Sequence, residues 1–409
     1  MRLVQVTHQP VVKNRPIRNR RKRLLTICVA VLLIMSIQLL RPLPEATITL
    51  SLPPLPQSIT AELDWPTSGQ ASVAAEGYGV LGLYGSNQPL ATASIAKVIT
   101  ALCILEKYPL QDDAQGPELT MSSQDVGFYQ DQIDQNGSRL PIAEGQKLTE
   151  RQALEAVMIP SANNIADSLA LWAFGSHEAY ATYANQYLAR NGLVRTRVGI
   201  DASGFDPSSE STAEDLAKLG LVARKNSVLM QIASQKNAQF GELGLYANYN
   251  TALGTYGING LKTGNNDQNP GALLYTADLL VGKQTVKLTG AVMGSDSLDG
   301  AIHSSQALVA SLAANFIPTT YLRSGQIVGT ARTAWGSTAS VRAHGAVELI
   351  RWKASATSEK HTLHPGRGTT MGSVGALAFH AGEVQASTTL EITQPADGPS
   401  VWWRLLRTR

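Results

Sequence analysis

Two polar residues, Ser94 and Lys97, stand three positions apart at the start of a strongly apolar stretch of the sequence. In a helix this spacing places both side chains on one face, within reach of each other. A lysine held in a dry environment loses its proton more easily and can then act as a base. A serine hydroxyl needs such a base to become a nucleophile. The pair therefore predicts a serine nucleophile with a lysine base, although a helix cap beside a surface lysine gives the same pattern.

Two further polar motifs follow later in the chain, and each has an ordinary structural explanation when taken alone. Ser161 and Asn163 stand at a break between two helical patterns, where serine and asparagine commonly cap a helix. The run Lys262-Thr263-Gly264 precedes a strand-like segment. Its glycine lets a substrate backbone lie close to a strand edge, and an ordinary turn is the alternative.

Taken together, the motifs occur in the order Ser-x-x-Lys, Ser-x-Asn, Lys-Thr-Gly, which is the set found in penicillin-binding proteins and class A β-lactamases. With the residues around them, the sequence resembles the serine D-alanyl-D-alanine carboxypeptidases, the low-molecular-mass penicillin-binding protein family. The resemblance covers roughly residues 65–315. The stretches that carry it are residues 92–100, 159–166, 211–216 and 260–264. The C-terminal part of the chain also resembles the β-domain of this family, although this resemblance is less specific.

The resemblance implies a role for each motif residue. Ser94 is expected to accept the acyl group, and Lys97 is expected to be its general base. Ser161 and Asn163 are expected to line the cleft, relay a proton and hold the substrate amide. The expected substrate-binding residues are Lys262, Thr263, Gly264 and Asn265. Among these, the lysine and threonine would bind the substrate carboxylate, and the N–H of Asn265 would complete an oxyanion hole with that of Ser94.

The reaction that the resemblance implies removes the terminal D-Ala from a peptidoglycan stem pentapeptide, through an acyl-enzyme that water resolves. β-Lactam antibiotics are expected to acylate Ser94 as substrate mimics, and neither a metal nor an organic cofactor is implied. The residues agree with a lysine base. No histidine lies between His8 and His177, so a Ser-His-Asp triad has poor support.

Two departures from the family pattern concern the substrate and the membrane. Members often carry an arginine beyond the Lys-Thr-Gly strand that helps to bind the terminal carboxylate, whereas the matching stretch 300–305 has none. His303 is a candidate substitute, and a surface histidine is the alternative. The family also commonly ends in a long amphipathic membrane helix. This sequence ends in a short stretch in which Trp402 suits either a membrane interface or packing on the β-domain.

Three other functions share these motifs or this fold. A class A β-lactamase carries a glutamate in a Glu-x-x-Leu-Asn string, and no such string follows Asn163. A peptidoglycan DD-endopeptidase is left open by the sequence. A non-catalytic cell-wall-binding protein is disfavoured by the intact motif set, and covalent penicillin labelling distinguishes it from an enzyme.

The N-terminus carries the signals for membrane insertion. Residues 1–23 contain eight lysines and arginines and no acidic residue, and residues 24–40 are uncharged. At about 1.5 Å per residue, the uncharged segment reaches about 25 Å, at the short end for crossing a bilayer. The pattern predicts a cytoplasmic tail, a single-pass anchor in the cell membrane and an extracytoplasmic remainder, with a cleaved signal peptide as the alternative. Because the basic excess lies in this tail, we expect no nucleic-acid binding.

The remaining chain divides into a proline-rich linker at 41–66, a mixed catalytic unit at 67–315 and a β-rich domain at 316–409. In the catalytic unit, helices are expected at 94–107, from a capping box at Thr149 and Gln152 to Pro160, at 212–224 and at 303–315. A strand is expected at 75–83, and two strands around a turn at Gly282 are expected within 272–295. In the β-rich domain, short strands are expected at 326–331, 338–343, 346–352, 375–379 and 387–392. The predicted fold class is an α/β (α+β) catalytic domain of the serine β-lactamase/DD-peptidase type, followed by a small all-β domain.

The composition agrees with a folded, exported protein. Hydrophobic residues make up 44% of the 409 residues and charged residues 16%, which excludes a disordered chain, a collagen and a coiled coil. The two cysteines exclude a disulfide framework and a thiolate metal cluster. Cys28 lies in the apolar N-terminal segment, and Cys103 lies in an apolar helical pattern, where core packing is expected.

Overall fold

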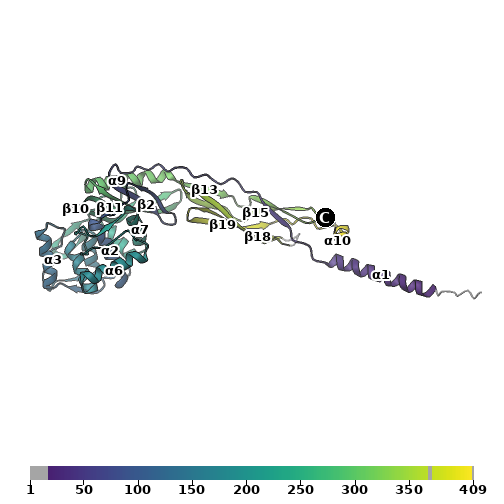
Figure 1. Cartoon of the computed structure of the whole chain (residues 1–409), viewed down its shortest axis with the longest axis horizontal. Helices are drawn as coiled ribbons and strands as arrows, with labels where there is room; N and C mark the ends of the chain where they lie inside the picture. The colour runs from purple at the N-terminus through teal and green to yellow at the C-terminus, as the bar shows by residue number, and fades with distance from the viewer. Residues whose placement is uncertain (1–16, 367–370, 408–409) are drawn as a thin grey trace, which may run out of the picture.

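The computed structural model describes residues 17–366 and 371–407 and shows an elongated molecule (Figure 1). A unit of mixed helices and strands lies at one end, a second sheet follows it, and helix α1 (Ile17–Leu40) lies at the other end. Most of the basic tail, residues 1–16, lies outside the described part of the chain. The expected fold class, a mixed α/β unit followed by an all-β domain, is confirmed.

The mixed unit is built on a five-stranded antiparallel sheet with the strand order β10-β11-β12-β2-β3. Its strands are β2 (Gln70–Ala75), β3 (Gly79–Tyr84), β10 (Ile258–Asn266), β11 (Asn269–Val281) and β12 (Gln284–Ser295). Successive side chains of a strand point to opposite faces. Leu274 accordingly packs into one core cluster, and its neighbours Leu273 and Tyr275 pack into another. Both faces of the sheet are therefore buried, which accounts for the nearly continuous apolar run of β11.

Helices cover both faces of this sheet. Helix α7 packs on β12 and β2 on the same face as α2 and α5, and α9 packs on the opposite face. The helices are α2 (Ala96–Lys107), α3 (Ser123–Asp134), α4 (Glu150–Met158), α5 (Asn163–Phe174), α6 (His177–Arg190), α7 (Ala213–Ala223), α8 (Ser227–Ala233) and α9 (Leu298–Leu312). The expected capping box of Thr149 and Gln152 is confirmed at the start of α4.

Short strand pairs connect these helices. They are β4 (Leu90–Ala91) with β7 (Glu210–Ser211), β5 (Glu118–Thr120) with β6 (Lys147–Thr149), and β8 (Asn237–Gln239) with β9 (Leu245–Ala247). The single strand expected at 75–83 is wrong, because a turn at Gly77 separates β2 from β3. Glycine is required there since φ is +78°, in the left-handed region.

The second part is a six-stranded antiparallel sheet in the order β1-β14-β15-β19-β18-β17, with a separate pair of β13 and β16. Its strands are β1 (Thr47–Leu50), β13 (Phe316–Leu322), β14 (Ile327–Arg332), β15 (Thr338–Ala343), β16 (Val347–Trp352), β17 (Thr357–Leu363), β18 (Gly372–Ala381) and β19 (Val384–Ile392). The pair of β13 and β16 joins the two parts. Tyr78 of the mixed unit donates a hydrogen bond to the Ile350 carbonyl at 2.7 Å, and Trp352 packs in the second core cluster of the mixed unit.

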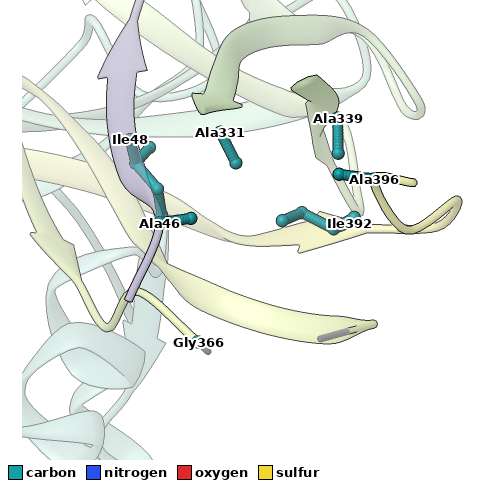
Figure 2. A pocket seen from close by; sticks show the side chains of 7 residues that line it. All are labelled: Ala46, Ile48, Ala331, Ala339, Gly366, Ile392 and Ala396. Carbon is teal, nitrogen blue, oxygen red and sulfur yellow. The ribbon is translucent and has the colours of Figure 1, made fainter. Parts of the chain in front are cut away.

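Part of the linker expected at 41–66 pairs with the second sheet. Its residues Thr47–Leu50 form the edge strand β1, which pairs with β14 because that strand otherwise presents a row of unpaired backbone groups. Figure 2 shows Ala46 and Ile48 facing Ala331 and Ile392 around a pocket in this sheet's core. The pocket holds only about 10 Å³, at most a single water, so it is a packing gap and not a ligand site.

The C-terminal helix α10 (Val401–Leu406) lies against the end of α1. Arg404 donates a hydrogen bond to the Leu39 carbonyl at 2.9 Å. Trp402 does not pack on the β-domain, because 72% of it is exposed. Its neighbour Trp403 packs there instead, edge-on to Trp335 with ring centroids 5.3 Å apart.

Candidate active site

Ser94 lies in a single turn of 3₁₀-helix, η1 (Ala93–Ile95), that leads directly into α2. Ala93 has φ of +45°, which is strained for a residue with a side chain and persists only where the surroundings fix it. Two glycines let neighbouring backbone segments pack directly against this turn. A Cβ at Gly264 in β10 would lie 2.9 Å from the Thr92 carbonyl oxygen, and one at Gly204 would meet the Ala93 carbonyl still more closely. The turn that carries Ser94 is therefore clamped between β10 and the loop after α6.

The Lys97 side chain is fully buried and faces three oxygen atoms. Its Nζ lies 2.8 Å from Ser94 Oγ, 2.7 Å from Asn163 Oδ1 and 2.9 Å from the Ser203 carbonyl oxygen. A neutral amine has two N–H groups and one lone pair. When the two N–H groups donate to Asn163 and Ser203, the lone pair is left for the hydroxyl proton of Ser94. This geometry suits a base that acts on Ser94.

Electrostatics favour the neutral form of this lysine. Burial lowers the pKa of Lys97 to about 7, while the charges of Asp201 and Asp167 oppose the decrease. Lys262, on β10, is also buried, and its pKa is lowered well below the usual value by burial and by the charge of Lys97. Two buried lysines that repel each other cannot both stay protonated easily, so the site favours one free amine at neutral pH.

Gln132, on α3, is a site residue that the motifs did not reveal. Asn163 Nδ2 donates a hydrogen bond to Gln132 Oε1 at 2.7 Å. Because a buried amide has one acceptor end and one donor end, this contact turns Asn163 Oδ1 towards Lys97. Gln132 lies 31 positions before Asn163 on a different helix, so no spacing rule could have paired them.

Replacing Gln132 by alanine is expected to slow acylation of Ser94 about tenfold. A buried donor left without a partner costs about 1–3 kcal/mol, and the Asn163 amide is then free to turn away from Lys97. The measurement is the rate of covalent labelling by benzylpenicillin. Gln135→Ala, at a second glutamine that lines the same cleft, is the matched control. Equal rates for the two variants would contradict the positioning role of Gln132.

The other motif residues surround this centre. Ser161 precedes α5, is buried and has φ of +61°, a second strained position beside the site. Within the described residues its hydroxyl makes no hydrogen bond, so its role in proton relay rests on the resemblance alone. Thr263 is buried, and its carbonyl accepts a hydrogen bond from Lys262 Nζ at 3.3 Å. Asn265 follows on the same strand and lines the cleft together with Ser94.

The cleft in front of Ser94 has a volume of about 750 Å³, enough for a short peptide. Five aspartates line it, namely Asp131, Asp167, Asp201, Asp206 and Asp267. Among the described residues, no lysine or arginine side chain lines it. His303 does not replace the expected arginine, because it lies on the exposed face of α9 away from the cleft lining. The cations behind this lining are the buried motif lysines and Arg139, which donates to the carbonyls of Gln132 and Gly137.

The chain is similar to known proteins over this region. Residues 74–297 match the family model described as D-alanyl-D-alanine carboxypeptidase. A D-alanyl-D-alanine carboxypeptidase of Streptomyces sp. strain K15 is 27% identical over 225 residues, which are 51% of this chain and 73% of that protein. The D-alanyl-D-alanine carboxypeptidase DacA of Haemophilus influenzae is 28% identical over 189 residues, 46% of this chain and 47% of that protein. This chain thus spans about half the length of the second relative.

The fold is also similar to that of a solved structure. Penicillin binding protein 5 from Haemophilus influenzae superposes with a TM-score of 0.58 at 18% identity, and the match covers 84% of this chain and all of that one. The match extends beyond the mixed unit, since that unit alone is smaller than the matched share.

Proposed function

This chain belongs to the D-alanyl-D-alanine carboxypeptidase family, whose model matches more than half of its residues, and we propose that it removes the terminal D-Ala of peptidoglycan stem pentapeptides through an acyl-enzyme on Ser94. The family predicted from the motifs is confirmed, and with it a serine hydrolase. The observation that carries the assignment of the nucleophile is the 2.8 Å contact of Lys97 Nζ with Ser94 Oγ.

The contact between Lys97 Nζ and Ser94 Oγ suggests how acylation proceeds. Lys97 takes the hydroxyl proton as Ser94 Oγ attacks the carbonyl carbon of the penultimate D-Ala, and the backbone N–H groups of Ser94 and Asn265 hold the oxyanion. The resulting ammonium keeps its hydrogen bonds to Asn163 and Ser203. The C–N bond then breaks, the proton passes to the leaving amine of D-Ala, and water later releases the acyl group.

The substrate carboxylate would bind close to Lys262 and Thr263. A carboxylate beside a buried lysine favours its ammonium form, and a cation at Lys262 makes protonation of Lys97 less favourable. Substrate binding would therefore help to keep the base neutral. Lys262 and Thr263 would in this way recognise the carboxylate without the arginine that is missing from stretch 300–305. β-Lactams, which carry a carboxylate and a reactive amide, would acylate Ser94 in the same way.

Helix α1 supports a location at the cell membrane. Within the described residues, it is the one helix long and apolar enough to cross a bilayer, with a mean hydropathy of 2.3 over Arg20–Leu40 and no buried residue there. With the basic residues on its N-terminal side, we infer a single-pass anchor and an extracytoplasmic catalytic unit. Peptidoglycan lies on that side of the membrane.

The test is mass spectrometry of a stem pentapeptide ending in D-Ala-D-Ala, incubated with the full chain in detergent. We expect loss of one alanine from the peptide. A cross-linked dimeric peptide is included in parallel, because cleavage of the cross-link without loss of D-Ala from the monomer would favour a DD-endopeptidase. If the chain forms no penicillin adduct and releases no D-Ala, the proposed function is wrong.

A further inference from the structure

Asp167 is a buried carboxylate in the lining of the cleft, and the motif set does not include it. It lies four residues after Asn163 on α5, so both side chains are on the same helical face. Only 7% of the residue is exposed, at the cleft wall. Its Oδ1 accepts a hydrogen bond from the Ala202 N–H at 3.0 Å. The carboxylate therefore anchors the loop that follows α6 to α5.

The anchored loop carries one of the three oxygens around Lys97. The residue after Ala202 is Ser203, whose carbonyl accepts from Lys97 Nζ at 2.9 Å. Ala202 is held from its other side as well, because its carbonyl accepts a 2.6 Å hydrogen bond from the Thr100 hydroxyl of α2. A loop has no ladder of its own to fix its carbonyls, so side-chain bonds set where the Ser203 oxygen lies. The Ala202 contacts fix the residue before it, and Asp201 Oδ1 accepts from the Gly204 N–H after it at 2.8 Å.

Several charged or titratable groups face Asp167. His177 Nε2 on α6 lies 3.7 Å from its Oδ1, Asp201 belongs to the anchored loop, and Lys97 is on α2. Tyr180 on α6 is close enough to sense the charge of Asp167, and Lys262 on β10 acts on Lys97. Burial raises the pKa of Asp167 to about 6, with Asp201 adding to the effect and the Ala202 N–H, His177 and Lys97 opposing it. Near neutral pH it is therefore mainly a carboxylate.

We propose that Asp167 is a positioning residue for acylation, which holds the Ser203 carbonyl on Lys97 through Ala202 and stabilises the ammonium that Lys97 becomes when it deprotonates Ser94. The proposal rests on the proposed function, because it assigns Asp167 a part in the same site. The Asp167 carboxylate has two effects on the site, a hydrogen bond and a charge. The hydrogen bond to Ala202 needs only an acceptor, whereas stabilisation of the ammonium needs the negative charge.

Two substitutions distinguish these effects in the full chain, with the rate of acylation by benzylpenicillin measured from about pH 5.5 to about pH 9. Asp167→Asn keeps an acceptor for Ala202 and removes the charge. We expect its rising limb to lie about half to one pH unit lower than that of the wild type, since Lys97 loses a neighbouring negative charge. Asp167→Ala removes both. We expect the same displacement and, in addition, a rate at high pH about tenfold below that of Asp167→Asn.

The control is Asp134→Asn, the same change at an exposed aspartate on α3, which should leave the pH profile where it is. A profile of Asp167→Asn that superimposes on the wild type overturns the role of the charge. Equal rates at high pH for Asp167→Asn and Asp167→Ala overturn the role of the hydrogen bond. Thermal unfolding checks that both variants fold, and if the alanine variant does not, the asparagine profile decides. A wild-type chain that is not acylated at all overturns the proposed function instead.

Discussion

Replacement of Ser94 by alanine is expected to eliminate the covalent penicillin adduct and to reduce D-Ala release by at least about 10⁴-fold, the scale seen when a serine nucleophile is lost. The reason is chemical, because no acyl-enzyme forms without Oγ. The fold should persist. Ser94 is partly exposed, and its Oγ contacts Lys97, which keeps its bonds to Asn163 and Ser203. Intact-mass spectrometry of the full chain after incubation with benzylpenicillin measures the adduct directly.

The matched control is Ser304→Ala on α9, a serine on the far side of the sheet from the cleft. It should label like the wild type. If Ser94→Ala still forms an adduct, peptide mapping would identify the residue that carries it, and the assignment of the nucleophile would be wrong. Thermal unfolding of both variants separates loss of chemistry from loss of fold.

Much of this site could be predicted because its residues are close in sequence or form a known set. Ser94 and Lys97 share one helical turn, so their spacing alone places them together. Asn163 joins them only through the fold, and its motif was informative because of the resemblance. The structure places Asn163 Oδ1 against Lys97, and it places Asn265 and Ser94 along one cleft. Local spacing predicts the pair of Ser94 and Lys97, whereas Asn163 and Asn265 were expected near them only because of the resemblance.

The rest could not be predicted, for three physical reasons. The Ser203 carbonyl is a main-chain group, so no residue type marks it. Gln132 reaches Asn163 across two helices, and only the packed fold brings them together. Strand β1 comes from a proline-rich stretch whose composition predicts a linker, and its pairing with β14 depends on an edge more than 270 positions away. Asp167 left a weak signal that could have been used, because it is the one charged residue of α5 and stands one helical turn after Asn163.

We expect the pH dependence of acylation to follow the protonation of Lys97. With a pKa of about 7, Lys97 is an ammonium in most molecules at pH 6 and a free amine in most at pH 8. Only the amine has a lone pair for the Ser94 proton. The rate of acylation should therefore rise about tenfold per pH unit below pH 7 and level off above it. The sign follows from desolvation, which disfavours the charged form of a buried lysine.

Replacement of Lys97 by alanine is therefore expected to lower the acylation rate by about 10²–10⁴-fold and to remove the rising limb from the pH profile. Lys97→Met tests the same point with less loss of volume, because it keeps a long side chain without an amine. Stopped-flow or quenched acylation by benzylpenicillin across the pH range measures both effects. A rate near that of the wild type, or a rising limb that survives in both variants, would mean that another group takes the Ser94 proton. Among the described residues that contact Ser94 by a side-chain hydrogen bond, Lys97 alone has a titratable nitrogen, so we expect the limb to disappear.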